Sequence, residues 1–250
     1  MDAEHQGNKT LVKCCTVRHC GGMNEEGFYR LMHRVHAPKQ IGGSFQFGSF
    51  ARYRQLEAEG DAHIGDAEEG LTHFDITDYF EAGSVEPRKR ARLKSLGFDI
   101  RSTAGHISIN RCRSTHTADA YVFSFSYGKP RELLKHFAKQ NSRPDPYDCA
   151  VKLPDPEWLA DFISRTGRLL TGEAIAHRMK SISWGKVQYG ENNFHYMADV
   201  PLADVVMRKR PRYADDNEYR IVLVPHRNEI QDNLYVTTNP PFGCMSIWEG

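Results

Sequence analysis

The chain has 250 residues, of which 40% are hydrophobic and 26% are charged, and its formal net charge is +1. At roughly 100–200 residues per domain, this length allows one large domain or one domain with an appendage, and we expect a single domain spanning residues 1–250. An aromatic content of 13 Phe, 11 Tyr and 3 Trp excludes a disordered chain, and the near-zero net charge by itself indicates no partner.

The N-terminal residues and the longest apolar runs bear on the compartment. No apolar run approaches the ~18 residues of a membrane helix, and residues 1–11 lack the apolar segment of a signal peptide. We therefore expect a cytoplasmic protein with no membrane partner and a flexible start at residues 1–10. One cluster, either of reduced thiols or of soft-metal ligands, contains Cys14, Cys15, His19 and Cys20. Because no second ligand pair accompanies it, the sequence assigns no metal.

Alternating apolar and polar residues predict most of the strands in the first half of the chain. These strands are expected at residues 10–17, 27–35, 44–50, 71–82, 99–110 and 121–126. A short helix is expected at residues 52–59, and the acidic, glycine-punctuated residues 57–70 are expected to form a surface loop. Residues 87–94 form a basic run, PRKRARLK.

The second half of the chain is expected to contain two helices and three strands. The helices are predicted at residues 130–140 and 156–170, the second with inward-facing Trp158, Leu159, Phe162 and Ile163. The strands are predicted at residues 149–153, 186–189 and 218–224. Many short strands with few helices indicate an α+β domain. No glycine-rich phosphate loop joins a strand to a helix, so the Rossmann and P-loop folds lack support.

Three positions could carry chemistry. Arg30 lies within a predicted strand, where it is either an outward-facing cation or a clamp for phosphate or carboxylate. Ser124 and Ser126 alternate with phenylalanines, so both hydroxyls share one face, which is either solvated or faces a ligand. Glu218 opens a strong strand and shares its face with Arg220, so it is either an ion-pair partner or a catalytic carboxylate.

Together, and in this order, these residues resemble the arginine–serine–glutamate class of ADP-ribosyltransferases. That class has an arginine on an early strand, often as Tyr-Arg, matched by Tyr29-Arg30. Its Ser-Thr-Ser triplet corresponds to Ser124-Phe125-Ser126, and its late glutamate to Glu218. Asp216 stands where the class has Glu or Gln, two residues before that glutamate. The chain also resembles bacterial toxin and phage-defence proteins that have a Ser-Phe-Ser strand and a late Glu-Tyr-Arg.

The resemblance implies a fold, a substrate and roles. The implied fold is α+β, with split mixed and antiparallel sheets and flanking helices. NAD would be the substrate, and Glu218 would stabilise the oxocarbenium-like transition state as the bond to nicotinamide breaks. Arg30 would hold the phosphates or ribose, and the two serines would orient the nicotinamide side and the glutamate. Tyr127 or Tyr53 would stack on the nicotinamide ring.

The acceptor of the ADP-ribose is expected to be a macromolecule. In the class that the chain resembles, the loop before the catalytic glutamate contacts the target. Here that loop is basic and has one aromatic ring, which fits RNA or DNA: it contains Arg208, Lys209, Arg210, Arg212 and Tyr213. A protein acceptor with an acidic surface is the open alternative. The implied role is that of a toxin or defence effector, for which an inhibitor or antitoxin protein would be a further partner.

Two other functions compete with this interpretation. A metal-dependent nuclease or phosphoesterase could take ligands from His63, Asp66, His73, Asp75 and the acidic residues 57–69, although none has the spacing of a known metal motif. A non-enzymatic module that binds nucleic acid or protein would use the basic runs, with Glu218 serving only as the partner of Arg220.

Overall fold

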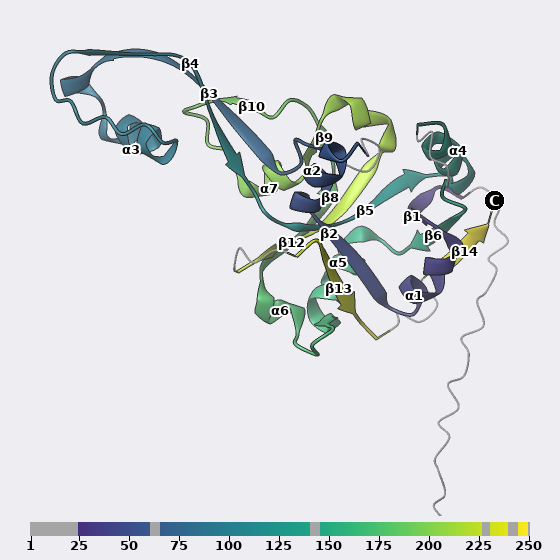
Figure 1. The fold of residues 1–250 in the computed structure, drawn as a ribbon. Helices are drawn as coiled ribbons and strands as arrows, with labels where there is room; N and C mark the ends of the chain where they lie inside the picture. The colour runs from purple at the N-terminus through teal and green to yellow at the C-terminus, as the bar shows by residue number, and fades with distance from the viewer. Residues whose placement is uncertain (1–24, 61–65, 141–145, 227–230, 240–244, 250) are drawn as a thin grey trace, which may run out of the picture.

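The structure, a computed structural model, describes residues 25–60, 66–140, 146–226, 231–239 and 245–249. A large antiparallel sheet forms the body, and a smaller mixed sheet extends from it as an arm (Figure 1). This arrangement confirms the α+β class, with mixed and antiparallel sheets and flanking helices. The strand predicted at residues 10–17 and the Cys14/Cys15/His19/Cys20 cluster lie outside the described residues.

Strand β5 (Tyr121–Gly128) is the centre of the large sheet. One edge of β5 pairs along most of its length with β12 (Glu218–Pro225), which pairs in turn with β8 (Met179–Lys186). The other edge supports two groups of strands. The first group is β1 (Gly27–Met32), β6 (Cys149–Leu153) and β14 (Ser246–Glu249); the second is β2 (Ser44–Ser49), β13 (Asn233–Thr237) and β7 (Arg168–Leu169).

The two groups, which we call the β1 wing and the β2 wing, share one edge of β5 without meeting in the ladder. β1 pairs with residues 126–128 of β5, and β2 pairs with Tyr121 and Val122. Residues 123–125 of β5 therefore have a ladder partner on the β12 side and a gap between the wings on the other. The sheet is split at this point, and the split positions the site described below.

Apolar side chains divide between the two faces of this sheet. On one face, Phe45, Phe123 and Ile221 form the main core with helices α1 (Ala37–Ile41), α5 (Pro156–Thr166) and α6 (Ile175–Arg178). On the other face, two smaller clusters pack under α4 (Pro130–Gln140) and under α2 (Phe50–Ala58) with α7 (Leu202–Val206). These clusters leave space between α2 and α4.

The arm has its own apolar cluster. The arm consists of β3 (Leu71–Glu81), β4 (His106–Thr117), β10 (Asn193–His195), the one-turn η2 (Ala82–Ser84) and α3 (Pro87–Ser95). Phe74, Ile76 and Leu93 are buried between sheet and helix. The strand predicted at residues 99–110 was therefore misplaced, because it begins at His106 and continues to Thr117.

Several other boundaries differ from the sequence predictions. The second predicted helix ends at Thr166, because Gly167 adopts an extended conformation, and Trp158 is 40% exposed while Leu159 and Ile163 are buried. Residues 179–186 form β8, a strand that the sequence prediction did not include except for its last residue, Lys186. Short elements complete the fold: η1 (Arg34–His36), β9 (Gln188–Tyr189), β11 (Arg208–Lys209) and η3 (Pro211–Asp216). In the described part of the chain, none of the helices has the length and apolar character needed to cross a bilayer.

Candidate active site

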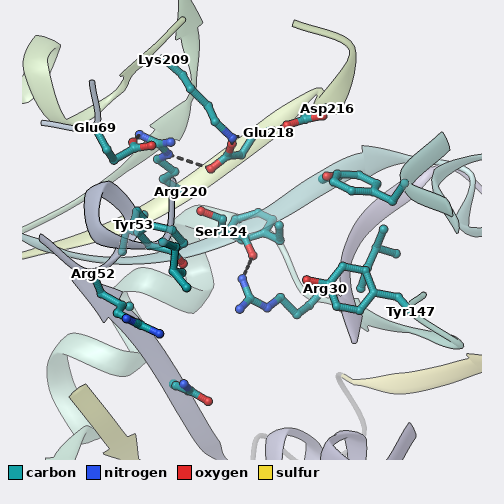
Figure 2. A pocket seen from close by; sticks show the side chains of 18 of the residues that line it. Arg30, Arg52, Tyr53, Glu69, Ser124, Tyr147, Lys209, Asp216, Glu218 and Arg220 are labelled. Carbon is teal, nitrogen blue, oxygen red and sulfur yellow. Dashed lines mark hydrogen bonds and ion pairs between the residues drawn. The ribbon is translucent and has the colours of Figure 1, made fainter. Parts of the chain in front are cut away.

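A cavity of about 390 Å³ opens at the split in the large sheet. Its floor comes from β5 and β12, one wall comes from β1 and α4, and the other comes from β2 and α2. The expected residues Arg30, Ser124, Ser126, Tyr53 and Glu218 all line it. Figure 2 shows Arg30, Tyr53, Ser124 and Glu218 around the cavity. Residues from three strands and a helix, spread over nearly 190 positions of the sequence, thus meet in one place.

Arg30 extends into the gap between the wings. Its Nη1 donates a hydrogen bond to the carbonyl oxygen of Ser124, and its Cζ lies 4.8 Å from the centre of the Phe123 ring. The gap explains this bond, because the backbone of residues 123–125 has no neighbouring strand on that side with which to form ladder hydrogen bonds. The guanidinium keeps other N–H groups on the cavity side, where it can bind an anion.

The register of β5 and β12 brings the serines and the glutamate onto one face. Glu218 lies directly opposite Ser126, and Arg220 lies opposite Ser124. Because alternate residues of a strand share a face, all four side chains point into the cavity, while Phe123 and Tyr219 point to the main core. The shared face predicted for Ser124 and Ser126, and the shared face predicted for Glu218 and Arg220, are confirmed; the pairing of β5 with β12 makes them one face.

The backbone just before β12 is fixed by local contacts. Asn217 is left-handed, with φ 43° and ψ 48°, a conformation that Asn tolerates better than most residues. Its side-chain amide donates to the carbonyl oxygen of Tyr127 at 2.6 Å. The N–H of Glu218 donates to the hydroxyl of Tyr189 at 2.9 Å. These bonds fix the point at which Glu218 enters the sheet.

Two cations bind the carboxylate of Glu218. Its Oε1 accepts from Nε of Arg220 at 2.8 Å, and its Oε2 accepts from Nζ of Lys209 at 2.8 Å. Burial alone would raise the pKa of the Glu218 carboxyl, but the charges and hydrogen bonds of Arg220 and Lys209 hold that pKa well below its ordinary value. Glu218 is therefore a buried carboxylate on the cavity floor whose ionised form two cations stabilise.

Two more carboxylates extend this charged cluster. Nη1 of Arg220 lies 2.6 Å from Oε1 of Glu69, and Nζ of Lys209 lies 3.4 Å from Oδ2 of Asp216. Arg220, Glu69 and Asp216 are each at most 5% exposed. Burial raises the pKa of Glu69 to about 7 and also raises the pKa of Asp216, whereas the pKa values of Lys209 and Arg220 rise because acidic neighbours outweigh their burial.

Gly70 shapes the turn that presents Glu69. Its φ is +68°, and a Cβ there would lie 2.6 Å from both the carbonyl oxygen of Ala118 and a ring carbon of Phe50. We expect Gly70→Ala to lower the free energy of unfolding by roughly 1–3 kcal/mol, since left-handed strain and a backbone clash add. Urea denaturation measures this loss. Gly97→Ala is the control for φ alone, since Gly97 has φ +92° with nothing within 4 Å; equal losses would contradict the clash.

The two tyrosines expected to stack on nicotinamide, Tyr53 and Tyr127, lie on opposite faces of the sheet. Tyr53 lines the cavity, where its ring lies against Gly48, at which a Cβ would approach the Tyr53 hydroxyl to 2.8 Å. Tyr127 follows Phe123 and Phe125 onto the opposite face, with its ring centre 5.1 Å from that of Phe28. The expected contact between Tyr127 and the ligand is therefore corrected: the alternation that directs the serines into the cavity directs Tyr127 away from it.

The basic loop expected to bind nucleic acid is engaged in internal contacts. Lys209 is bound by Glu218, Arg210 by Glu57 and Asp66, and Arg212 by Glu57. Arg208 lies over the ring of Phe194, and Tyr213, only 7% exposed, is packed against three of these cations. The expected open patch with a ring free for stacking is therefore corrected: Glu57, Asp66 and Glu218 pair with three of its cations, and the Tyr213 ring is buried. The side chain of Arg212, 45% exposed, still faces solvent.

The second basic run is likewise used within the fold. On α3, Arg90 and Arg92 donate to backbone carbonyl oxygens, and Lys89 lies 2.7 Å from Asp78. Among the basic residues of this helix, Arg88 and Lys94 are exposed.

The residues proposed as metal ligands for a nuclease also have other partners. Asp66 pairs with Arg210, His73 with Glu68, and Asp75 with Arg113. His63 lies outside the described residues. In the ranges that the structure describes, no three His, Cys, Asp or Glu side chains are grouped so that they could bind a metal ion.

Sequence reasoning missed part of the site. Glu69 was placed in a surface loop with its acidic neighbours, although it is 3% exposed. Arg52 of α2 and Tyr147 before β6 also line the cavity. A usable signal existed for Glu69: it immediately precedes a glycine and an alternating strand, which marks the end of a loop rather than its exposed middle.

Comparisons of the chain with protein-family models, with the curated proteins and with the solved structures found no match.

Proposed function

We propose that the protein cleaves the bond between nicotinamide and ribose in NAD and transfers the ADP-ribose to a macromolecule. The observation that carries this proposal is the convergence of Arg30, Ser124, Ser126 and Glu218 in one cavity at the split of the sheet. The sequence resemblance assigned roles to these four residues. Their meeting in the cavity supports those roles.

The geometry suits the charge changes of this reaction. Nicotinamide leaves from a cationic nitrogen, so the ribose gains positive charge, and little acid catalysis is needed. A buried carboxylate beside that ribose stabilises the developing charge without having to reorganise. Glu218 provides it, with the hydroxyls of Ser124 and Ser126 on the same face to orient the nicotinamide side. Arg30, and Arg52 at the opposite wall, provide positive charge for the diphosphate.

Asp216 supports the transfer half of the proposal. It lines the cavity two residues before Glu218, as the last residue of η3, and Nε2 of His136 lies 3.4 Å from its Oδ1. A carboxylate with a raised pKa at this position can accept the proton of an attacking hydroxyl or amine. The exposed cations Arg88, Arg212 and Lys94 are candidates for contact with an RNA or DNA acceptor.

The test uses the whole chain and NAD labelled separately in the nicotinamide and in the adenine. Release of labelled nicotinamide, together with attachment of the adenine label to RNA, DNA or lysate protein, supports the proposal. Release without attachment indicates hydrolysis of NAD. If no nicotinamide is released with any acceptor, the proposal is wrong.

A conservative change at Arg30 tests its role in binding. We expect Arg30→Lys to raise KM for NAD about tenfold with a smaller change in kcat, because an ammonium cannot bind both phosphate oxygens and the Ser124 carbonyl as the guanidinium fork can. Steady-state nicotinamide release measures both constants. Arg165→Lys, on the exposed side of α5, is the matched control. A KM unchanged by Arg30→Lys would contradict the role.

A further inference from the structure

The carboxylate of Glu69 is connected to that of Glu218 through one buried guanidinium. Nη1 of Arg220 lies 2.6 Å from Glu69, and Nε of the same side chain lies 2.8 Å from Glu218. Arg220 is 1% exposed and also donates to the carbonyl oxygen of Val206 at 3.1 Å. A rigid guanidinium shared in this way makes the position and the effective charge of one carboxylate depend on the other.

Glu69 also belongs to the wall of the cavity, although the proposed reaction gives it no role. It comes from the turn before β3, whereas Glu218 comes from β12, and both line the same cavity (Figure 2). Its backbone is fixed by its own turn and by α2: the N–H donates to the carbonyl oxygen of Asp66 at 2.9 Å, and its carbonyl accepts from Arg54 at 2.6 Å. The side chain is therefore presented to Arg220 by a fixed loop.

We propose that Glu69 is a positioning residue that controls, through Arg220, how much negative charge Glu218 presents to the reacting ribose. The inference rests on the proposed function. When Glu69 is ionised, it shares the positive charge of Arg220, which leaves Glu218 less neutralised. When Glu69 is protonated, Arg220 is committed to Glu218, and the cavity wall loses one negative charge as the cationic transition state forms.

The number of charges in the cluster supports this dependence of Glu218 on the ionisation of Glu69. Glu218, Glu69 and Asp216 carry three negative charges against the two positive charges of Lys209 and Arg220. Protonation of Glu69 removes the excess negative charge. The groups around Glu69 are Arg220 and Glu218 of β12, Lys209 of β11, Asp66 of its own turn, and Tyr53 and Arg54 of α2. Asp66 is neutralised by Arg210 and Arg54 is paired with Asp119, so they add little net charge.

The pKa of Glu69, raised by burial to about 7, places the change near neutral pH. The kcat for nicotinamide release is expected to rise with pH across this region. In Glu69→Gln, whose amide never ionises, we expect the rise to disappear and kcat above pH 8 to fall on the order of tenfold, while KM for NAD stays within about twofold. A residue with only a structural role would lower kcat equally at every pH.

Glu68→Gln is the matched control. Glu68 adjoins Glu69 in the same turn but pairs with His73, away from Arg220. It should keep the pH rise. If Glu69→Gln keeps it too, the inference is overturned and the proposed function stands. If the wild type releases no nicotinamide at any pH, both are overturned, so the two failures are distinguishable.

A second variant covers the case in which Glu69→Gln does not fold. Glu69→Asp keeps a titrating carboxyl but withdraws it by one methylene from Arg220. Because Arg220 then attracts the carboxylate less strongly, burial raises the pKa of residue 69 further. The midpoint of the rise of kcat with pH should therefore move to higher pH. An unchanged midpoint would overturn the inference.

Discussion

Glu218→Gln is expected to lower the rate of nicotinamide release by on the order of 100-fold to 1,000-fold, with a much smaller effect on KM for NAD. The amide has almost the same shape as the carboxylate but carries no charge. It therefore removes the electrostatic stabilisation of the cationic ribose while keeping most of the cavity wall. Rapid-quench measurement of a single turnover isolates this step from product release.

The matched control for Glu218→Gln is Glu132→Gln, on the exposed side of α4, where the side chain is 71% exposed. It should release nicotinamide at the wild-type rate. Circular dichroism shows whether Glu218→Gln is folded, which matters because Lys209 and Arg220 would lose their ionic partner. A folded Glu218→Gln protein with wild-type activity would rule out the catalytic role.

Arg220→Met is expected to have the largest effect on stability, a loss of about 3–5 kcal/mol in the free energy of unfolding. Methionine fills much of the space but leaves Glu218 and Glu69 buried without the cation that lies between them. Denaturation in urea at pH 8, above the pKa of about 7 of Glu69 in the wild type, measures the loss.

Arg165→Met is the control for Arg220→Met, because Arg165 pairs with Asp161 on the surface of α5 and an exposed pair contributes at most about 1 kcal/mol. The loss from Arg220→Met should shrink in the background of Glu69→Gln, since the carboxylate that faced Arg220 at position 69 is then already absent. A loss no larger than that of Arg165→Met would contradict the role of Arg220 as the link between the carboxylates.

Local periodicity predicted the parts of the site that depend on single strands. The alternation of Ser124 and Ser126 with phenylalanines defined their shared face, and the strand that begins at Glu218 was placed correctly. The same rule should have excluded Tyr127, which is an odd number of residues from both serines and therefore lies on the other face.

What the sequence did not predict depends on long-range pairing of charges. Arg210 and Arg212 were assigned to a basic patch because their neighbours in sequence are also basic, but Glu57, which pairs with both, lies 153 and 155 positions earlier. The buried carboxylate of Glu69 faces the guanidinium of Arg220, about 150 positions later, at 2.6 Å. Burial of a charge is decided by its partner, and no local pattern reveals a partner at that separation.

The split of the large sheet has a consequence for ligand entry. Both wings are hydrogen-bonded to β5, so the floor of the cavity cannot widen unless ladder bonds of that strand break. A ligand that enters between α2 and α4 therefore meets a largely preformed floor. The sheet loses little conformational freedom when the ligand binds. If NAD binds as proposed, this rigidity favours its capture in one conformation over gradual mutual adjustment.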